Sequence, residues 1–185
     1  MELKTRRLLL MPPCDEDAAR ITALIGDWRV ASMLSRVPYP YPEGGAADWI
    51  AKQADAVAQG RAVGFLMHRR YRPGEGAIGG IGLEPATVDQ DGTRQAEMGY
   101  WLGVPYWGRG YATEAARAVL AHGFAAMALD RVTAGYFLEN PASAGVLHKT
   151  GFRPTQANPR WCEARACEVA CQDMAVDRAG FVAVA

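Results

Sequence analysis

The sequence lacks several features that would decide its class at once. It has no apolar run as long as a membrane-spanning helix needs, and its first residues carry mixed charge with no apolar leader. Its 20 basic and 20 acidic residues cancel, and no block of one sign stands out. Composition therefore gives no case for a nucleic-acid partner. We expect a cytoplasmic protein that acts on neither membranes nor nucleic acid.

Patterns typical of metal sites and of covalent hydrolases are also missing. The chain has four cysteines, and Cys162, Cys167 and Cys171 follow one another at intervals of five and four residues, without a paired C-x-x-C. This spacing does not predict a zinc site, and reduced thiols are the expectation for a cytoplasmic chain. The three histidines form no recognisable triad with serine or cysteine.

What the chain does have is apolar content, 50% over 185 residues, which is enough for one domain with its own core. Apolar periodicity and turn residues delimit the elements. Strands are predicted at residues 7–11, 62–69, 77–83, 95–102, 131–138, 152–154 and 168–176, and helices at 18–25, 43–59, 108–128 and 140–150. This order predicts a mixed α/β sheet with helices on both faces.

Three details of this reading are specific enough to test. Gly79, Gly80 and Gly82 weaken a strand, so they predict bulges or the close approach of another backbone. Asp15 is the expected N-cap of the first helix, and Trp49, Ile50 and Val57 are expected to face the core from the second. The alternating prolines of segment 37–42 force an extended backbone, either a surface lid or one wall of a ligand cleft.

The most informative stretch is 104–115, where a strand ends and a helix begins. Gly108 and Gly110 would let a phosphate approach the free amides of the helix start, and Arg109 and Thr113 would add a charge and a hydroxyl. No Gly-Lys-Ser/Thr follows and the third glycine of a dinucleotide fingerprint is missing, which disfavours nucleotide triphosphatases and dinucleotide dehydrogenases. By themselves, the two glycines are equally compatible with a packing turn.

Three segments taken together are more specific. Residues 107–115 read Trp-Gly-Arg-Gly-Tyr-Ala-Thr-Glu-Ala, residues 139–152 carry Asn-Pro-Ala-Ser and Lys-Thr-Gly-Phe, and residues 6–10 read Arg-Arg-Leu-Leu-Leu. In this order they resemble the GNAT acetyltransferase superfamily, and within it the RimJ/RimL branch. Trp107 departs from the general rule of the superfamily, which has Gln or Arg at that place, although the wording of 107–115 is typical of the branch.

The resemblance implies a single GNAT-like domain over residues 1–185, of class α/β (α+β). Its mixed, mostly antiparallel sheet would have about six to seven strands, splayed at a cleft for acetyl-CoA, the co-substrate, with no metal. Backbone groups exposed by the splay would pair with the pantetheine arm, and the amides of 108–113 would hold the pyrophosphate. The implied cofactor-binding residues are Trp101, Leu102, Val104, Trp107, Gly108, Arg109, Gly110, Tyr111, Ala112, Thr113, Asn140 and Ser143.

The chemistry needs a base for the amine and a proton for the departing thiolate. Glu97 is the candidate base, on the strand that would border the cleft; the alternative is a solvent-facing glutamate. Ser143 is the candidate proton donor, in line with the family signature; the alternative is a serine bonded to its own first helical turn. Asn140 is either a pantetheine contact or simply an N-cap, or both. Tyr111 and Tyr136 are alternative donors.

The sequence indicates the acetyl acceptor less clearly than the acetyl-CoA site. We expect a primary amine, with a protein N-terminus the leading acceptor. The alternatives are a small-molecule amine, such as a polyamine, amino acid or aminoglycoside, and a non-catalytic CoA-binding sensor of the same fold. A monomer and a homodimer are both compatible with the apolar end at 181–185.

Overall fold

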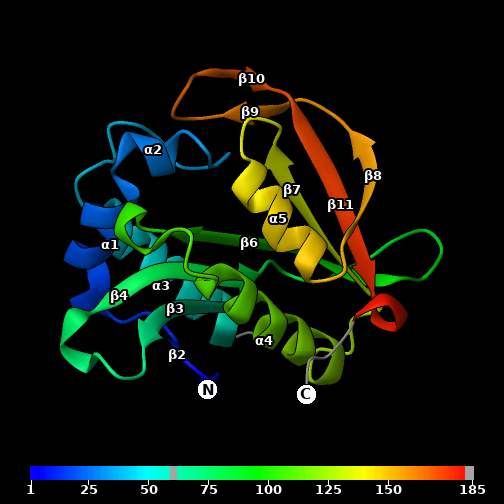
Figure 1. Ribbon diagram of the computed structural model, residues 1–185, viewed down its shortest axis with the longest axis horizontal. Coiled ribbons are helices and arrows are strands. Elements are labelled where there is room, and N and C mark those ends of the chain that lie inside the picture. The colour runs from blue at the N-terminus through cyan, green and yellow to red at the C-terminus, as the bar shows by residue number, and fades with distance from the viewer. Residues whose placement is uncertain (59–61, 182–185) are drawn as a thin grey trace.

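The computed structural model describes residues 1–58 and 62–181 (Figure 1). Its helices are α1 (Ala18–Ile25), α2 (Trp28–Ala31), α3 (Gly45–Ala58), α4 (Tyr111–Ala125) and α5 (Pro141–Lys149). Its strands are β1 (Leu3–Lys4), β2 (Leu8–Met11), β3 (Val63–Arg69), β4 (Ala77–Leu83), β5 (Thr87–Val88), β6 (Arg94–Leu102), β7 (Arg131–Phe137), β8 (Arg153–Ala157), β9 (Arg160–Cys162), β10 (Cys167–Val169) and β11 (Cys171–Asp177).

One mixed sheet organises the molecule. Its strand order is β1-β2-β3-β4-β6-β7-β11-β8, with β5 added beside β6. Neighbouring strands are antiparallel except for β6 and β7, which run parallel. The seven strands predicted for this sheet are all present. It has nine strands because β1 and β5, of two residues each, are too short to show a periodicity.

Helices cover both faces of the sheet, as predicted (Figure 1). On one face Leu120 of α4 and Leu147 of α5 are fully buried against strand residues such as Leu8 and Met174. On the other face α1, α2 and α3 pack around the fully buried Leu66 in a second cluster. Burial of these apolar side chains is the main stabilising term, and it places the carboxyl end of β6 between the two layers.

Several boundaries differ from the prediction. Residues 168–176 are not one strand, because the chain leaves one sheet for another at Ala170: β10 pairs with β9 in a separate hairpin, and β11 begins at Cys171. Asp15 is the first residue of a 3-10 turn that precedes α1, and not a cap of the helix itself. Ile50 is buried as expected, but Val57 is 40% exposed. The short helix α2 was not predicted, and the expected stop at Gly60 lies outside the described residues.

The glycines of β4 do mark close approaches of neighbouring chain segments. A Cβ at Gly79 would overlap the carbonyl oxygen of Trp101, and one at Gly80 would come within 2.7 Å of the Trp101 indole nitrogen. A Cβ at Gly82 would come within 2.6 Å of the Val63 carbonyl oxygen. Because Gly79 and Gly80 have no side chains, β6 can lie close against β4 and the Trp101 ring can pack over this strand.

Candidate functional site

The two parallel strands of the sheet separate after a short contact. β6 pairs with β7 only from Gln95 to Glu97, opposite Arg131–Thr133. Beyond this point β6 continues to Leu102 with β4 as its partner. The splay that the family resemblance implies is therefore present, with Glu97 at its apex.

The alternation of the β6 backbone decides which residues face the gap. The Glu97 carbonyl accepts a hydrogen bond from the Glu84 amide on the β4 side (2.9 Å), and the Trp101 carbonyl points at Gly79 of β4. Because peptide groups alternate along a strand, those of Tyr100 and Leu102 face β7 across the gap. A pantetheine arm that pairs with β6 would meet these two residues, which makes Tyr100 a candidate contact that the sequence analysis did not name.

The remaining residues predicted to contact the pantetheine make hydrogen bonds or backbone contacts within the protein. The backbone of Trp101 is directed to β4, which leaves only its indole for a ligand. Val104 lies in the 3-10 turn Val104–Tyr106 and its carbonyl accepts the Trp107 amide (3.2 Å). The Trp107 indole donates to the Leu102 carbonyl (2.7 Å). The Trp107 indole therefore joins the end of β6 to the turn that follows, and the amide is the backbone group of Leu102 that remains for a ligand.

The glycine turn has the form expected of an anion site. Gly108 and Gly110 have φ of 71° and 75°, in the left-handed region that favours glycine. Gly110 directly precedes α4, and no side chain caps this helix. Its first amides therefore lack partners within the helix and point toward the turn with a partial positive charge. A Cβ at Gly108 would meet nothing within 4 Å, so the turn is open to a pyrophosphate.

The other predicted phosphate residues contribute backbone more than side chains. Tyr111 and Ala112 are each 8% exposed, with side chains in the core, so they offer their amides. Thr113 is half-buried in the first turn of α4, and the Arg109 side chain is exposed in solvent. Arg109 and Thr113 thus lie within and directly after the glycine turn, and their contact with a phosphate stays a prediction.

Across the gap, α5 approaches β6 through a pair of hydroxyl groups. Ser143 Oγ lies 2.7 Å from the Tyr100 hydroxyl, which also donates to the Ser143 carbonyl (3.2 Å). Burial raises the pKa of Tyr100 to about 12, against a smaller opposing effect of the Ser143 hydrogen bond. Tyr100 therefore keeps its proton at neutral pH. Asn140 caps α5 by accepting the Ser143 amide (3.0 Å), as its alternative reading proposed.

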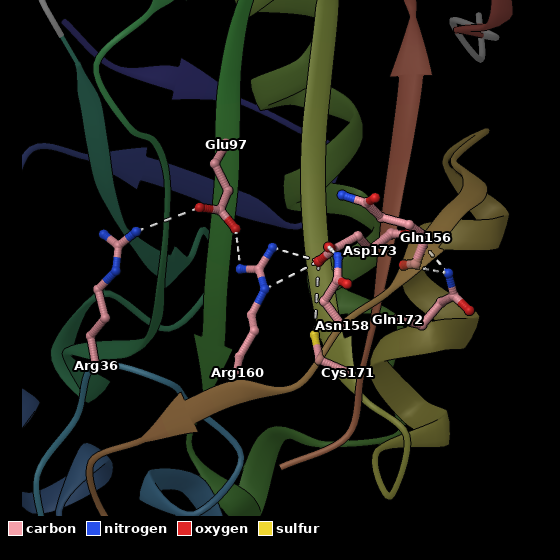
Figure 2. Close-up of polar contacts among 8 residues, drawn as sticks. All are labelled: Arg36, Glu97, Gln156, Asn158, Arg160, Cys171, Gln172 and Asp173. Carbon is pink, nitrogen blue, oxygen red and sulfur yellow. Dashed lines mark hydrogen bonds and ion pairs between the residues drawn. The ribbon is translucent and has the colours of Figure 1, made fainter. Parts of the chain in front are cut away.

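On the opposite face of the sheet Glu97 is part of a chain of ion pairs (Figure 2). Its Oε1 accepts from Arg160 Nη1 of β9 (2.5 Å), and its Oε2 lies 3.5 Å from Arg36 Nη2. Arg160 also binds Asp173 of β11 through Nη2 (2.6 Å). Burial alone would lower the pKa of Arg160, but the hydrogen bonds and charges of Glu97 and Asp173 raise it. The Glu97 side chain is 30% exposed, with a short ion pair at Oε1 and a long contact at Oε2.

The arginine that holds Glu97 crosses β7 where that strand has no side chain. A Cβ at Gly135 would lie 2.9 Å from Arg160 Cζ. Arg160 was not predicted, because it lies in the hairpin that the sequence pattern did not reveal. Gly135, a glycine inside a strand, is the one signal that could have suggested a close approach there.

A cavity of about 230 Å³ adjoins Glu97 on this face and includes Arg36, Glu84 and Thr133 in its lining. Arg36 comes from the loop after α2, and this loop is fastened to the β9–β10 hairpin by a hydrogen bond from the Glu163 amide to the Ser35 carbonyl (3.0 Å). The proline segment begins directly after Arg36, and most of it is exposed. The cavity lining therefore includes the residue directly before this segment, Arg36, while the prolines lie at the surface.

Other site types find no support within residues 1–58 and 62–181. In this part of the chain no group of three or more His, Cys, Asp or Glu residues is placed to hold a metal ion. No helix described there combines the length and apolarity that crossing a membrane requires. The four cysteines, all of them described, are free thiols, with Cys162 and Cys171 buried and Cys167 exposed.

Comparison with known proteins agrees with this geometry. The model of the acetyltransferase (GNAT) domain matches residues 7–153. The chain is 30% identical over 151 residues to the uncharacterized N-acetyltransferase YoaA of Bacillus subtilis (82% of each chain), and 28% identical over 144 residues to the putative ribosomal N-acetyltransferase YdaF of the same organism (74% and 73%). The structure of Mycobacterium smegmatis RimJ in complex with CoA-disulfide superposes with a TM-score of 0.78 at 23% identity, covering 97% and 87%. The chain belongs to the GNAT acetyltransferase family and is an acetyl-CoA-dependent N-acetyltransferase.

Proposed function

We propose that this enzyme acetylates the terminal α-amine of a protein, and that transfer takes place in the gap between β6 and β7. The relationship to the putative ribosomal enzyme YdaF and the RimJ-like fold support a protein acceptor. The observation that carries the place of transfer is the hydroxyl pair of Tyr100 and Ser143. The two oxygens are 2.7 Å apart and join α5 to β6 beside the gap. With Glu97 at the apex, the gap has a carboxylate on one face of the sheet and a proton donor on the other.

Acetyl-CoA supplies the acetyl group as a thioester. The free amides of 108–113 fit its pyrophosphate, and the backbone of Tyr100 and Leu102 fits its pantetheine arm. In this arrangement a β6 amide in the gap donates to the thioester carbonyl oxygen as negative charge develops there. Such a preformed donor lowers the barrier because it needs no reorganisation during the reaction.

Glu97 and Ser143 divide the proton transfers between them. Glu97 receives the proton of the acceptor ammonium through Oε2, because Arg160 occupies Oε1 and Arg36 makes only a long contact. The amine nitrogen then bonds to the acetyl carbon, and the carbon–sulfur bond breaks. Ser143 donates its hydroxyl proton to the departing sulfur, and Tyr100 donates its own proton to Ser143 Oγ. The second proton of the nitrogen passes to water, from which Tyr100 regains a proton, so the products are a neutral amide and a neutral thiol. The acceptor's proton and the sulfur's proton thus pass through different residues.

The charges around the cavity argue against a polyamine acceptor. A polycation would favour unpaired acidic walls. The carboxylates of Glu84, Glu97 and Asp173 each bind an arginine, Arg36 or Arg160, within 3.0 Å. A second ammonium could bind there only if one of these ion pairs opened. A single peptide amine that approaches Glu97 Oε2 leaves all of them in place.

A release assay with a panel of acceptors tests the proposal. CoA release is measured with short peptides, with the same peptides acetylated at the N-terminus as matched controls, and with spermidine, free amino acids and an aminoglycoside. We expect turnover with free peptide N-termini and none with the blocked peptides. Faster turnover with a polyamine or an aminoglycoside would contradict the protein acceptor, and CoA binding without turnover on any amine would contradict the catalytic roles.

A further inference from the structure

Arg7 lies directly before β2 and contacts the glycine turn at residues 108–110. Its Nη1 donates to the carbonyl of Arg109 inside the turn (3.0 Å), and its Nε donates to Glu114 Oε2 on α4 (2.6 Å). Its guanidinium also lies over the ring of Tyr111, with Cζ 4.8 Å from the ring centroid. A residue from the beginning of the chain therefore contacts both the turn and the first turn of the helix that follows it.

Glu114 fixes this arginine in place. Its Oε1 accepts both the Arg7 amide (2.6 Å) and the Thr5 hydroxyl (2.6 Å), so backbone and side chain of Arg7 bind the same carboxylate. The Glu114 side chain is only 16% exposed. Burial by itself would raise the pKa of Glu114, but the hydrogen bonds from Thr5 and Arg7 outweigh it and lower the pKa. The ion pair is thus a fixed part of the fold, unlike a solvent-exposed pair of two long side chains.

The contact with the Arg109 carbonyl has a geometric consequence. A trans peptide group is planar, and its C=O and N–H point in opposite directions. The carbonyl of Arg109 and the amide of Gly110 belong to one such plane. When Arg7 holds the carbonyl from behind, the Gly110 N–H is directed to the other side of the turn. Without this contact the plane is free to rotate, because glycines at 108 and 110 allow many backbone conformations.

We propose that Arg7 is a positioning residue for the pyrophosphate of acetyl-CoA, and that it acts by orienting the Gly110 amide. The inference rests on the placement of the pyrophosphate at 108–113. Because Glu114 balances the charge of Arg7, the effect comes from the orientation of the amide and not from an added net charge at the amino end of α4. Arg7 therefore affects how tightly acetyl-CoA is held, and not the transfer of the acetyl group once it is bound.

Two acetyl donors separate this role from a merely structural one. S-acetylpantetheine has the thioester and the pantetheine arm of acetyl-CoA but no pyrophosphate. For Arg7→Ala we expect the KM for acetyl-CoA to rise about tenfold, the size of one lost charge-assisted hydrogen bond, with kcat nearly unchanged. The kcat/KM for S-acetylpantetheine should stay at the value of the parent enzyme. An equal loss with both donors, or no change with acetyl-CoA, would overturn the proposal.

Two further variants keep the test decisive if Arg7→Ala folds poorly. Arg7→Lys keeps the charge but cannot bind Glu114 and the Arg109 carbonyl in the same fork geometry, so its KM should also rise. Arg70→Ala is the matched control, because Arg70 donates to the nearby Thr5 carbonyl (2.7 Å) and its loss should leave the KM unchanged.

Direct binding provides a readout that needs no acceptor. The dissociation constant of CoA is measured by calorimetry for Arg7→Lys, Gly110→Ala and the double variant. If Arg7 acts through the Gly110 amide, the effects of the two substitutions will be less than additive. Additive effects would contradict the mechanism. A wrong acceptor would leave these constants untouched, so this test fails independently of the proposed function.

Discussion

Replacing Gly110 with alanine and then with valine tests the pyrophosphate placement in two steps. Gly110 has φ of 75° and ψ of 11°, a backbone conformation that residues with a side chain rarely adopt. On the protein side a Cβ would meet only Arg7 Nη2, at 3.5 Å, an ordinary contact. The cost of a side chain therefore comes from the backbone conformation and from the ligand, and not from a clash within the protein.

The free-energy cost of holding a side-chain-bearing residue at position 110 can be estimated from the backbone conformation there. An L-residue held in the left-handed region costs about 1–2 kcal/mol, which lowers the population of the binding-competent turn roughly 5- to 30-fold. Apparent affinity falls by the same factor, because only the competent fraction binds. We expect Gly110→Ala to weaken CoA binding about tenfold. Gly110→Val should weaken it on the order of 100-fold, because a β-branched residue tolerates a positive φ poorly and projects toward the phosphate.

Calorimetric titration with CoA measures these constants, and Gly92→Ala is the matched control. Gly92 has φ of 80° in an exposed turn, and a Cβ there would meet nothing within 4 Å. Its substitution carries a similar backbone cost but lies outside the proposed site, so it should lower the melting temperature without changing CoA affinity. If Gly110→Val binds CoA as tightly as the parent enzyme, the pyrophosphate does not lie at this turn.

Three further predictions concern the acid and the base of the site and the anchor of the turn. Glu97→Gln should lower turnover on the order of 100-fold, chiefly where the acceptor amine is protonated, and an unchanged pH–rate profile would remove Glu97 from the mechanism. Ser143→Ala should lower kcat and leave CoA affinity unchanged, and Tyr100→Phe should do so more weakly. Because burial raises the pKa of Tyr100 to about 12, an ultraviolet titration of the Tyr100→Phe variant should lose part of the ionisation near pH 12, and an unchanged titration would contradict the burial of this phenol. For Glu114 the pKa is lower in the folded chain than its ordinary value of 4.5, so its stabilisation is present above pH 4.5 and is lost as pH falls through the folded pKa. Urea unfolding of Glu114→Gln should accordingly show a weaker dependence on pH below about 4.5, and an identical dependence in both proteins would contradict the ion pair.

Residue patterns predicted those parts of the fold that depend on neighbours in sequence. The alternation of 95–102 and the glycine turn before α4 are local, and both have the form expected of them. The hairpin of β9 and β10 was missed because only Ala170, which is not a turn residue, separates Val169 from Cys171 where the chain changes sheets. No local pattern shows such a change.

In the candidate site, too, features that depend on neighbours in sequence were predicted and contacts between distant segments were not. Gly108 and Gly110 were predicted from their own conformational freedom and the helix start that follows. Arg160 reaches Glu97 across β7, and Arg7 reaches Glu114 from the other end of the chain, so neither contact leaves a local trace. Tyr100 was within the predicted strand, but its importance comes from Ser143, which the fold brings to it. Long side chains that join distant segments are what sequence patterns describe least.

The alternation of β6 also explains how one strand can serve two proton transfers. Glu97 and Tyr100 are an odd number of residues apart, so they point to opposite faces of the sheet. The contacts agree, because Glu97 binds Arg36 and Arg160 on one face and Tyr100 binds Ser143 of α5 on the other. Between them β6 has already parted from β7, since the parallel pairing ends at Glu97. The proposed transfer brings an amine from the Glu97 face and a thioester from beside α5 into this gap, so it requires the parallel pairing to end at Glu97.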